Sequence, residues 1–554
     1  MSVPQMTFST LIREMEGNNT TRDWDVLVSY DEEKINKVLE KMEQETSKDF
    51  VITKKDEDPN TGDLIDIEYR LKIANPTLQF TFTDSEAEVS YKLTGDYGKL
   101  PIKVPDNTTM KITAKIASLQ GKVTTTSKSP SFVPYKEAIE APENQWVKQG
   151  PNYVVRIADV GHAQGVCIIF RKCRVTLHNK SQDETVQRRV ASIEAAVRQN
   201  ISDEMAESGF HYVVSAVNAP VPLVRETTSV TLRPKSFCFS FYQRDEANKR
   251  PGALIMWIGV DGGYNNGDHE EGSTSLHFQP GDREVNPIPQ KSSASIIIMH
   301  DLLARKFLMP ALETKLDNVC LNSTKGTKGM ELTGSLRNTE IRIGRYEKRY
   351  KCGLFNQYVC KEGFDGVKTN CDKPKTKIVI SPRPVSNGDS VTLSYESDRL
   401  QSEWYSDTGT GGHIPYNDMY FNFEWAGTGK WEAAEGDKPN KIRLRFENTN
   451  EWIVKVSGSK PPWWIPDEPD RLPNVYEKLV MKVDIDIPIA ELDYFLTTNL
   501  LFPGQHVFKA HAPYTKGDDH KGLAVPRDLI LTGDVNDKLA DSYSTAHSSR
   551  TSVL

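Results

Sequence analysis

The stretch of residues 24–42, WDVLVSYDEEKINKVLEKM, changes its hydrophobic period halfway along. Its first half alternates apolar and polar residues, which is typical of a strand with one buried face. Its second half repeats apolar residues at steps of three and four, which predicts an amphipathic helix. The apolar positions are Trp24, Val26, Val28 and Tyr30, and then Ile35, Val38, Leu39 and Met42. Ser29 and Glu32 have the spacing of a capping box at the junction. We therefore expect a strand that passes into a helix, whose apolar face later strands cover.

A long series of alternating segments follows this helix. Apolar and polar residues alternate at 65–73, 78–82, 89–93 and 110–116, with turn residues between them. Strands with one dry and one wet face are typical of an antiparallel sheet. The region 330–490 is again mostly strands, so the fold class expected is α+β with long antiparallel sheets and amphipathic helices.

Two later segments predict helices. An apolar stripe follows a second capping-box pair, Ser181 and Glu184, and indicates a long helix over 184–208 that packs on a sheet. Residues 292–316 repeat the opening theme, because a β-branched run passes into a helix there. Pro310 should kink or end that helix.

The chain has 554 residues, more than the roughly 250–300 that one hydrophobic core usually covers. We expect an elongated molecule with two lobes. The divisions predicted are a polar lead-in at 1–22, lobes at 23–220 and 221–536, and a disordered tail at 537–554. A short helix is expected at 489–501.

Charge and cysteine content limit the possible partners and the expected cellular location. The net charge of −7 does not suggest a nucleic-acid partner, which would require a clustered basic surface. No apolar run approaches the ~20 residues of a membrane span, and the first residues do not have the pattern of a secretory signal. Seven cysteines, an odd number, favour reduced thiols and a cytoplasmic location. The spacing of Cys352, Cys360 and Cys371 fits no zinc site, so free thiols are favoured there over a metal or disulfide role.

Three segments could carry chemistry, and each has a plainer interpretation. Asp261 with the acidic run 268–271 could bind a cation, or could be a solvated loop. His300 and Asp301 are neighbours on a helix and do not face each other, so Asp301 is expected to cap the helix at 302–312. Glycines at 409–412 lack the Lys-Ser/Thr of a phosphate loop and are expected to form a turn. No catalytic motif is present, so we expect neither an enzyme nor a cofactor.

The order of these segments resembles the P47 family of clostridial toxin gene clusters and its fungal relatives of unassigned role. The matching segments are WDVLVSY–DEEKINKVL at the front, KSFCFSF–GALIMWIGVDGG in the middle, and ASIII with the helix and proline that follow. The C-terminal FLTTNLLFPGQHVF–GLAVPRDLILTG resembles the fungal relatives more than the bacterial ones. The helix at 184–208 and the extra C-terminal strands go beyond the bacterial pattern.

This resemblance implies the tubular lipid-binding fold, in which a strongly curved antiparallel sheet wraps a long helix. It also implies that a lipid or other apolar ligand is held, and possibly carried, in a groove between sheet and helix, without catalysis. The groove would be lined by Val38, Leu39, Met42, Phe80 and Phe82 around the first helix, and by Phe239, Trp257, Leu303 and Phe307 around a later one. The competing expectation is a close-packed seam with no groove. The alternative function is a structural or assembly component of a toxin-like or other protein complex, with a protein partner and no ligand.

Two surface features could contact a membrane peripherally. The basic residues Arg342, Arg345, Lys348 and Arg349 could form a patch for anionic lipid head groups, or an ordinary solvated strand edge. The segment 461–466, PPWWIP, could be an aromatic wedge, or could cover the end of a sheet.

Overall fold

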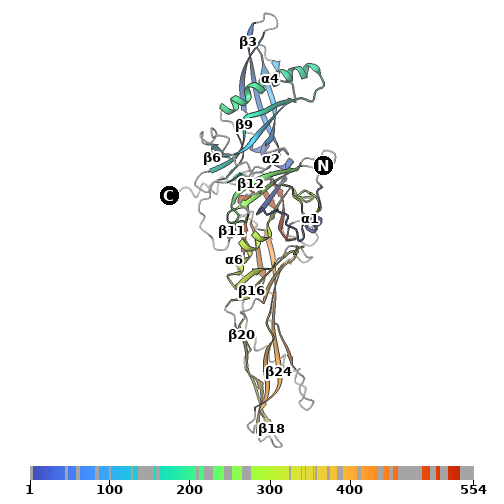
Figure 1. Cartoon of the computed structure of the whole chain (residues 1–554), viewed down its shortest axis with the longest axis vertical. Coiled ribbons are helices and arrows are strands. Elements are labelled where there is room, and N and C mark those ends of the chain that lie inside the picture. The colour runs from blue at the N-terminus through green and yellow to red at the C-terminus, as the bar shows by residue number, and fades with distance from the viewer. Residues whose placement is uncertain are drawn as a thin grey trace.

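The computed structural model shows a long, narrow molecule in which three large β-sheets follow one another along the long axis (Figure 1). At some positions only the backbone is described. The residues described are 4–43, 48–57, 63–80, 86–98, 102–126, 129–134, 155–156, 163–207, 211–217, 229–242, 252–264, 276–322, 326–337, 340–343, 345–352, 355, 358–370, 375–383, 391–407, 413–433, 441–447, 453–458, 490–498, 507–511 and 522–536.

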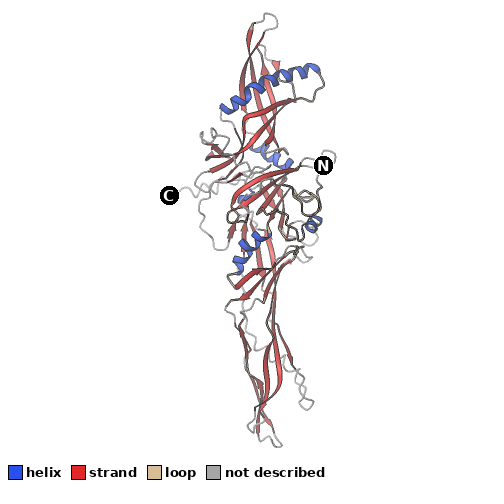
Figure 2. Ribbon diagram, in the orientation of Figure 1, coloured by secondary structure: helices blue, strands red, loops and turns tan. Residues whose placement is uncertain are grey.

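The first sheet occupies one end of the molecule and is antiparallel throughout its described pairs. In spatial order its strands are β10 (His211–Val217), β9 (Ala163–His178), β6 (Thr109–Thr126), β4 (Glu86–Tyr97), β3 (Leu64–Phe80) and β2 (Lys48–Glu57), with β5 (Ile102–Lys103) beside β4 and β7 (Ser129–Pro134) beside β6. Helix α4 (Glu184–Glu207) lies against β9 and β2 (Figure 2). Its buried side chains Val190, Ile193 and Val197 join the apolar residues of the sheet. The predicted long helix is confirmed, and it lies on the inner face of a curled sheet.

The central sheet unites segments from both ends of the chain. In spatial order its strands are β28 (Phe508–Ala510), β30 (Leu529–Val535), β14 (Ala294–Ile298), β1 (Val26–Asp31), β13 (Ala253–Val260), β12 (Pro234–Tyr242) and β8 (Val155–Arg156), with β29 (Leu523–Ala524) beside β30. Strand β1 passes directly into helix α2 (Glu32–Glu43), as the change of period predicts. The expected capping box is wrong, because Ser29 is buried within β1 and the Asp31 carboxylate accepts the backbone N–H of Lys34 instead.

Strand β1 is buried on both faces, which contradicts the expectation of one wet face. The second face is covered by helix α1 (Phe8–Met15), whose Leu11, Ile12 and Met15 pack in a separate apolar cluster with Leu27 and Trp257. The described part of the predicted lead-in, residues 4–22, therefore contains a packed helix. The Glu16 carboxylate, just after α1, forms ion pairs with Lys328 and Arg383 and so attaches this end of the helix to loops of the third sheet.

The third sheet extends to the opposite end of the molecule. Its main path is β11 (Ser229–Thr231), β27 (Ala490–Asp493), β25 (Lys441–Glu447), β24 (His413–Ala433), β22 (Val391–Glu396), β21 (Thr376–Ile380), β16 (Met330–Leu336) and β15 (Leu316–Leu321). Four further strands are β23 (Leu400–Asp407), β19 (Tyr358–Phe364), β18 (Tyr346–Cys352) and β26 (Ile453–Gly458), and β17 (Glu340–Ile343) pairs separately with β20 (Val367–Asn370). The short β11–β27 pair is parallel, whereas the other described pairs are antiparallel.

A continuous helical segment follows β14 and packs on the third sheet. It consists of α5 (His300–Leu302), a π-helical turn η2 (Leu303–Leu308) and α6 (Met309–Leu312). The π-turn lies directly before Pro310, whose ring would clash with a carbonyl four residues earlier in a regular α-helix. In the wider turn the Met309 N–H reaches the Ala304 carbonyl, five residues back. The proline therefore widens the helix before it ends at Leu312.

The chain is mostly β, with two strongly curled half-barrel sheets and few, mostly short helices among the described residues. This corrects the expected α+β class with several long helices. Residues 489–501 are not one short helix either, because β27 precedes α8 (Phe495–Thr498) there. The main hydrophobic core contains residues of all three sheets, so it runs from one predicted lobe into the other. The lobe boundaries remain a prediction.

Candidate ligand-binding site

The seam between the helical segment 300–312 and the third sheet holds two of the predicted groove residues. Leu303 and Phe307 both lie in the π-turn and are buried in the main core. The Phe307 ring stacks on the indole of Trp431, with ring centroids 6.4 Å apart and 24° between their planes. Trp431 comes from β24, where it lies opposite Leu444 of β25. An aromatic pair thus joins the helix to the sheet.

Among the described residues, the indole N–H of Trp431 has no hydrogen-bond partner, although the side chain is only 6% exposed. A buried donor without an acceptor costs about 1–3 kcal/mol, and most buried polar groups in native proteins are paired. The neighbouring side chains identified above, Phe307 and Leu444, carry no acceptor. The seam therefore offers one hydrogen-bond donor in apolar surroundings.

The structure brings together only part of the predicted groove lining. Val38, Leu303 and Phe307 are buried in the same main core. Trp257 lies on the other face of the central sheet, in the cluster beneath α1, and its Nε1 donates to the Ser240 hydroxyl at 2.6 Å. The side chains of Leu39, Met42, Phe80 and Phe239 lie outside those described, as does the whole of Phe82. The groove lining as a set remains a prediction.

The sequence analysis does not single out Trp431, because nothing in its local pattern separates it from other strand aromatics. Its role depends on a partner helix far away in the sequence. The alternation of β24 could have placed it on a buried face, but no sequence rule would have shown that its N–H lacks an acceptor.

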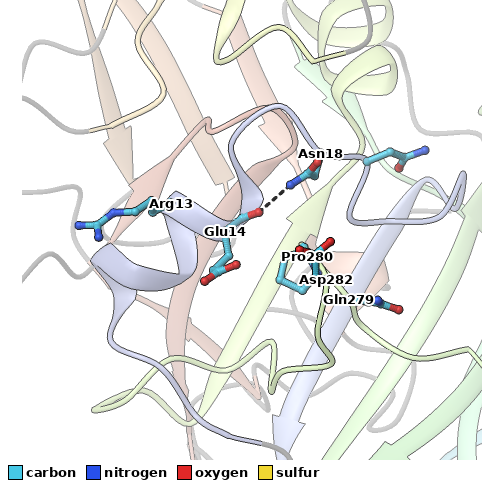
Figure 3. Close-up of a pocket in the computed structure, with 8 residues that line it drawn as sticks. Arg13, Glu14, Asn18, Gln279, Pro280 and Asp282 are labelled. Atoms are coloured by element: carbon cyan, nitrogen blue, oxygen red, sulfur yellow. Dashed lines mark hydrogen bonds between the residues drawn. The ribbon is translucent and has the colours of Figure 1, made fainter.

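A hollow of about 430 Å³ lies elsewhere, between α1 and the loop before β14 (Figure 3). Its lining is polar and of mixed charge: Arg13, Glu14, Asn18, Asn19, Gln279, Pro280, Gly281 and Asp282. The Asn18 side-chain amide donates to the Glu14 carbonyl at 2.8 Å, across one side of the hollow. Such a lining does not suit an apolar ligand.

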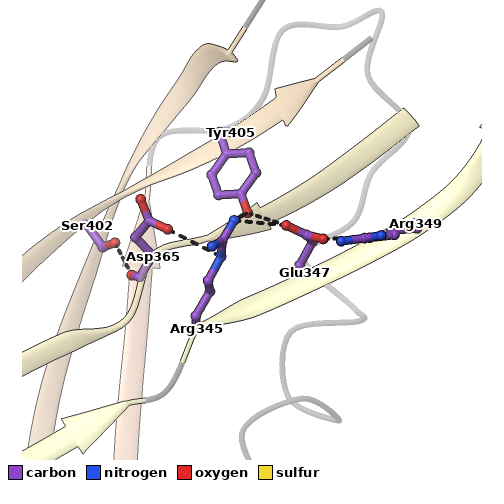
Figure 4. Close-up of polar contacts among 6 residues, drawn as sticks. All are labelled: Arg345, Glu347, Arg349, Asp365, Ser402 and Tyr405. Carbon is purple, nitrogen blue, oxygen red and sulfur yellow. Dashed lines mark hydrogen bonds and ion pairs between the residues drawn. The ribbon is translucent and has the colours of Figure 1, made fainter. Parts of the chain in front are cut away.

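Two of the predicted head-group arginines are held in a network of side chains (Figure 4). The Arg345 guanidinium contacts Glu347 at 2.8 Å, the Tyr405 hydroxyl at 3.0 Å and Asp365 at 3.5 Å. Arg349 donates to the other oxygen of Glu347 at 2.7 Å, and this hydrogen bond lowers the pKa of that carboxyl. The network fastens β18 to β23, because Tyr405 belongs to β23.

The four predicted patch residues are not arranged on one face. Lys348 precedes Arg349 on the same strand, so their side chains point to opposite faces of the hairpin. For Arg342, in β17, only the backbone is described.

His300 lies in a buried, hydrogen-bonded environment. Its backbone N–H donates to the buried Asp528 carboxylate at 2.9 Å, and its Nδ1 lies 3.0 Å from the Arg527 carbonyl. Burial lowers the pKa of His300. Asp528, and not Asp301, therefore caps this helix, which corrects the expectation. Asp301 lies 3.7 Å from Arg305, one turn along.

The structure does not describe the other candidate segments in full. The acidic run 268–271, the glycines 409–412 and the segment 461–466 lie outside the described residues. Within the described ranges, His, Cys, Asp and Glu side chains form no group of three that could hold a metal, and no helix is long and apolar enough to span a membrane. Cys360 is disulfide-bonded, so the expectation of a free thiol there is wrong.

The chain was compared with protein families, curated proteins and solved structures. No family model and no curated protein matches it. Its structure is similar to P47 from Clostridium botulinum A2, with 11% identity, a TM-score of 0.43 and coverage of 94% of this chain and 100% of the other. It is also similar to P47 of Clostridium botulinum E1, with 10% identity, a TM-score of 0.40 and coverage of 93% and 99%. A third match is lipopolysaccharide binding protein, with 8% identity, a TM-score of 0.20 and coverage of 93% and 99%. The first two belong to the family that the sequence resembles.

Proposed function

We propose that this protein binds an acyl lipid, or a similar apolar ligand that carries a hydrogen-bond acceptor, and that it does so without catalysis. The site is the seam between the helical segment 300–312 and strands β24 and β25. The proposal rests on one observation: the indole N–H of Trp431 is buried beside Phe307 and has no acceptor in the part of the chain that the structure describes.

The chemistry of the seam selects the class of ligand. An apolar chain gains roughly 0.8 kcal/mol for each methylene that it buries, so apolar surroundings favour a hydrocarbon chain. A pure hydrocarbon would leave the Trp431 N–H unpaired. An ester, amide or carboxyl oxygen would accept that hydrogen bond and fix the orientation of the ligand. An acyl chain satisfies both demands.

Two matched probes test this assignment with the full-length protein. One is a fluorescent fatty acid, and the other is the same fluorophore on an alkyl chain of equal length without the carboxyl group. The fatty acid should bind more tightly to the unaltered protein. Trp431→Phe keeps an aromatic ring but removes the N–H, so it should weaken fatty-acid binding about fivefold and change alkyl binding little.

Trp425→Phe is the control variant. Trp425 lies six residues before Trp431 on β24, and an even separation places both side chains on one face of the strand. It should leave the preference for the fatty acid unchanged. An unaltered protein that binds neither probe, or a Trp431→Phe variant with the same preference as the unaltered protein, would contradict the proposal.

A further inference from the structure

The hairpin of β18 and β19 lies at the extreme end of the molecule, on the far side from the first sheet (Figure 1). Its strands pair antiparallel, with Tyr350 opposite Cys360, Lys351 opposite Val359 and Cys352 opposite Tyr358. The chain between them, residues 353–357, reads Gly-Leu-Phe-Asn-Gln. Strand β19 also pairs with β23 over residues 361–364, so only the outer part of the hairpin lies beyond that pairing.

Large apolar side chains are exposed at this end. Phe355, in the connection, is 83% exposed and Val359 is 55% exposed, and Tyr350 and Tyr358 are also exposed. The other exposed large apolar residues of the described chain are dispersed, at Val51, Leu64, Ile102, Tyr264, Val379 and Ile453. A single exposed apolar residue is ordinary, whereas a concentration of them indicates a contact surface.

Positive charge lies on the same face of the hairpin as Val359, whereas Tyr350 and Tyr358 lie on the other face. Arg349 lies directly opposite Lys361, and Lys351 follows on the same face. Like charges opposite each other on paired strands are unfavourable unless an anion lies nearby. Glu347 pairs with Arg349. The Glu347 carboxylate also attracts Lys361, whereas Lys351 makes no ion pair within the described part of the chain.

We propose that this hairpin end attaches the protein to an anionic lipid bilayer. Phe355 enters the interfacial region, where aromatic side chains of membrane proteins concentrate. Lys351 and Lys361 then face the phosphates and anionic head groups, which attract both cations. The attachment is peripheral, because one short hairpin contributes few apolar side chains.

The shape of this end favours a bilayer over a protein partner. A stable protein interface covers roughly 800 Å² on each side, formed by some 20–30 residues. The part of β18 and β19 that lies beyond the pairing with β23 presents fewer residues. A lipid surface needs no such area, because shallow insertion of aromatic rings and the attraction of cations act together.

Flotation of the full-length protein with vesicles tests the proposal. Phosphatidylcholine vesicles containing phosphatidylserine should carry the protein upward, and vesicles of phosphatidylcholine alone should carry much less. Added salt should weaken the binding, because salt screens exposed charges. Phe355→Ser should lower the affinity for the anionic vesicles about tenfold. Lys351→Gln and Lys361→Gln should each lower it about fivefold and make it less dependent on salt.

Two control variants alter similar side chains elsewhere. Leu64→Ser changes an exposed apolar residue of β3, in the first sheet, and Lys103→Gln changes an exposed lysine of β5. Both should float as the unaltered protein does. The proposal is overturned if the unaltered protein ignores anionic vesicles, if the hairpin variants float unchanged, or if the controls lose as much affinity. This result is independent of Trp431, so either proposal can fail alone.

Discussion

Thr20 and Asp528 are 508 residues apart in the sequence and are joined by two buried hydrogen bonds. The backbone N–H and the hydroxyl of Thr20 both donate to Asp528 Oδ2 at 2.7 Å. The other carboxylate oxygen accepts the His300 N–H, so one side chain connects three distant segments beside the central sheet. Burial raises the pKa of Asp528, and the hydrogen bonds oppose that rise. These hydrogen bonds thus hold segments from the N-terminal and C-terminal regions together beside the central sheet.

Replacing Asp528 by Ala should destabilise the protein strongly. The change leaves three donors without their acceptor in a buried region, and we expect the free energy of unfolding to fall by about 3 kcal/mol. Urea unfolding of the full chain, followed by tryptophan fluorescence, measures this.

Asp317→Ala serves as the comparison, because Asp317 forms an exposed ion pair with Arg337. Such a pair contributes about 0–1 kcal/mol. Equal losses from the two substitutions would show that the contacts of Asp528 do not stabilise the central sheet.

Local periodicity was enough to predict several elements. The change of period at 24–42 predicted β1 and α2, and the apolar stripe after Ser181 predicted α4. Both predicted capping boxes are wrong, for the same reason. Asp183 caps α4, as Asp31 caps α2, because a carboxylate next to the helix accepts its first N–H groups in place of the more distant serine.

The sequence pattern could not predict which distant elements pack against one another. Nothing in residues 24–30 shows that α1 will cover the second face of β1, because that contact depends on chain folding back over the sheet. The candidate site shows the same limit. Leu303 and Phe307 were expected at a helix–sheet seam, but Trp431 became visible only through its position against Phe307.

Phe307 should be a major contributor to stability because it is almost fully buried between helix and sheet. We expect Phe307→Ala to lower the free energy of unfolding by about 3–5 kcal/mol. Phe355→Ala, which removes the same atoms from an exposed site, should change it by less than about 0.5 kcal/mol. Thermal or urea unfolding of both variants provides the comparison, and similar losses would be inconsistent with this packing.

The buried His300 should make the free energy of unfolding depend on pH. Burial lowers its pKa below the ordinary value of 6.5, so the unfolded chain binds a proton that the folded chain resists. The contribution of His300 to stability is therefore complete above pH 6.5 and decreases as the pH falls below it. In His300→Gln, which does not titrate, the free energy of unfolding should fall less steeply between pH 7 and pH 5. Parallel pH profiles for the two proteins would refute this assignment.

The cysteines should differ in reactivity. Cys320 is a free, exposed thiol, whereas Cys360 is disulfide-bonded. Alkylation of the folded protein without reductant, followed by peptide mass spectrometry, should label Cys320 and leave Cys360 unlabelled. Prior reduction should make Cys360 reactive. Labelling of Cys360 without reductant would contradict the disulfide.

Native mass spectrometry of the purified full-length protein tests the ligand proposal most directly. We expect a species heavier than the polypeptide by the mass of an acyl lipid, which organic solvent releases, and a smaller fraction of that species in Trp431→Phe. A polypeptide mass without ligand in repeated preparations, unchanged after incubation with fatty acid, would contradict the proposal that the seam at Phe307 and Trp431 binds a lipid.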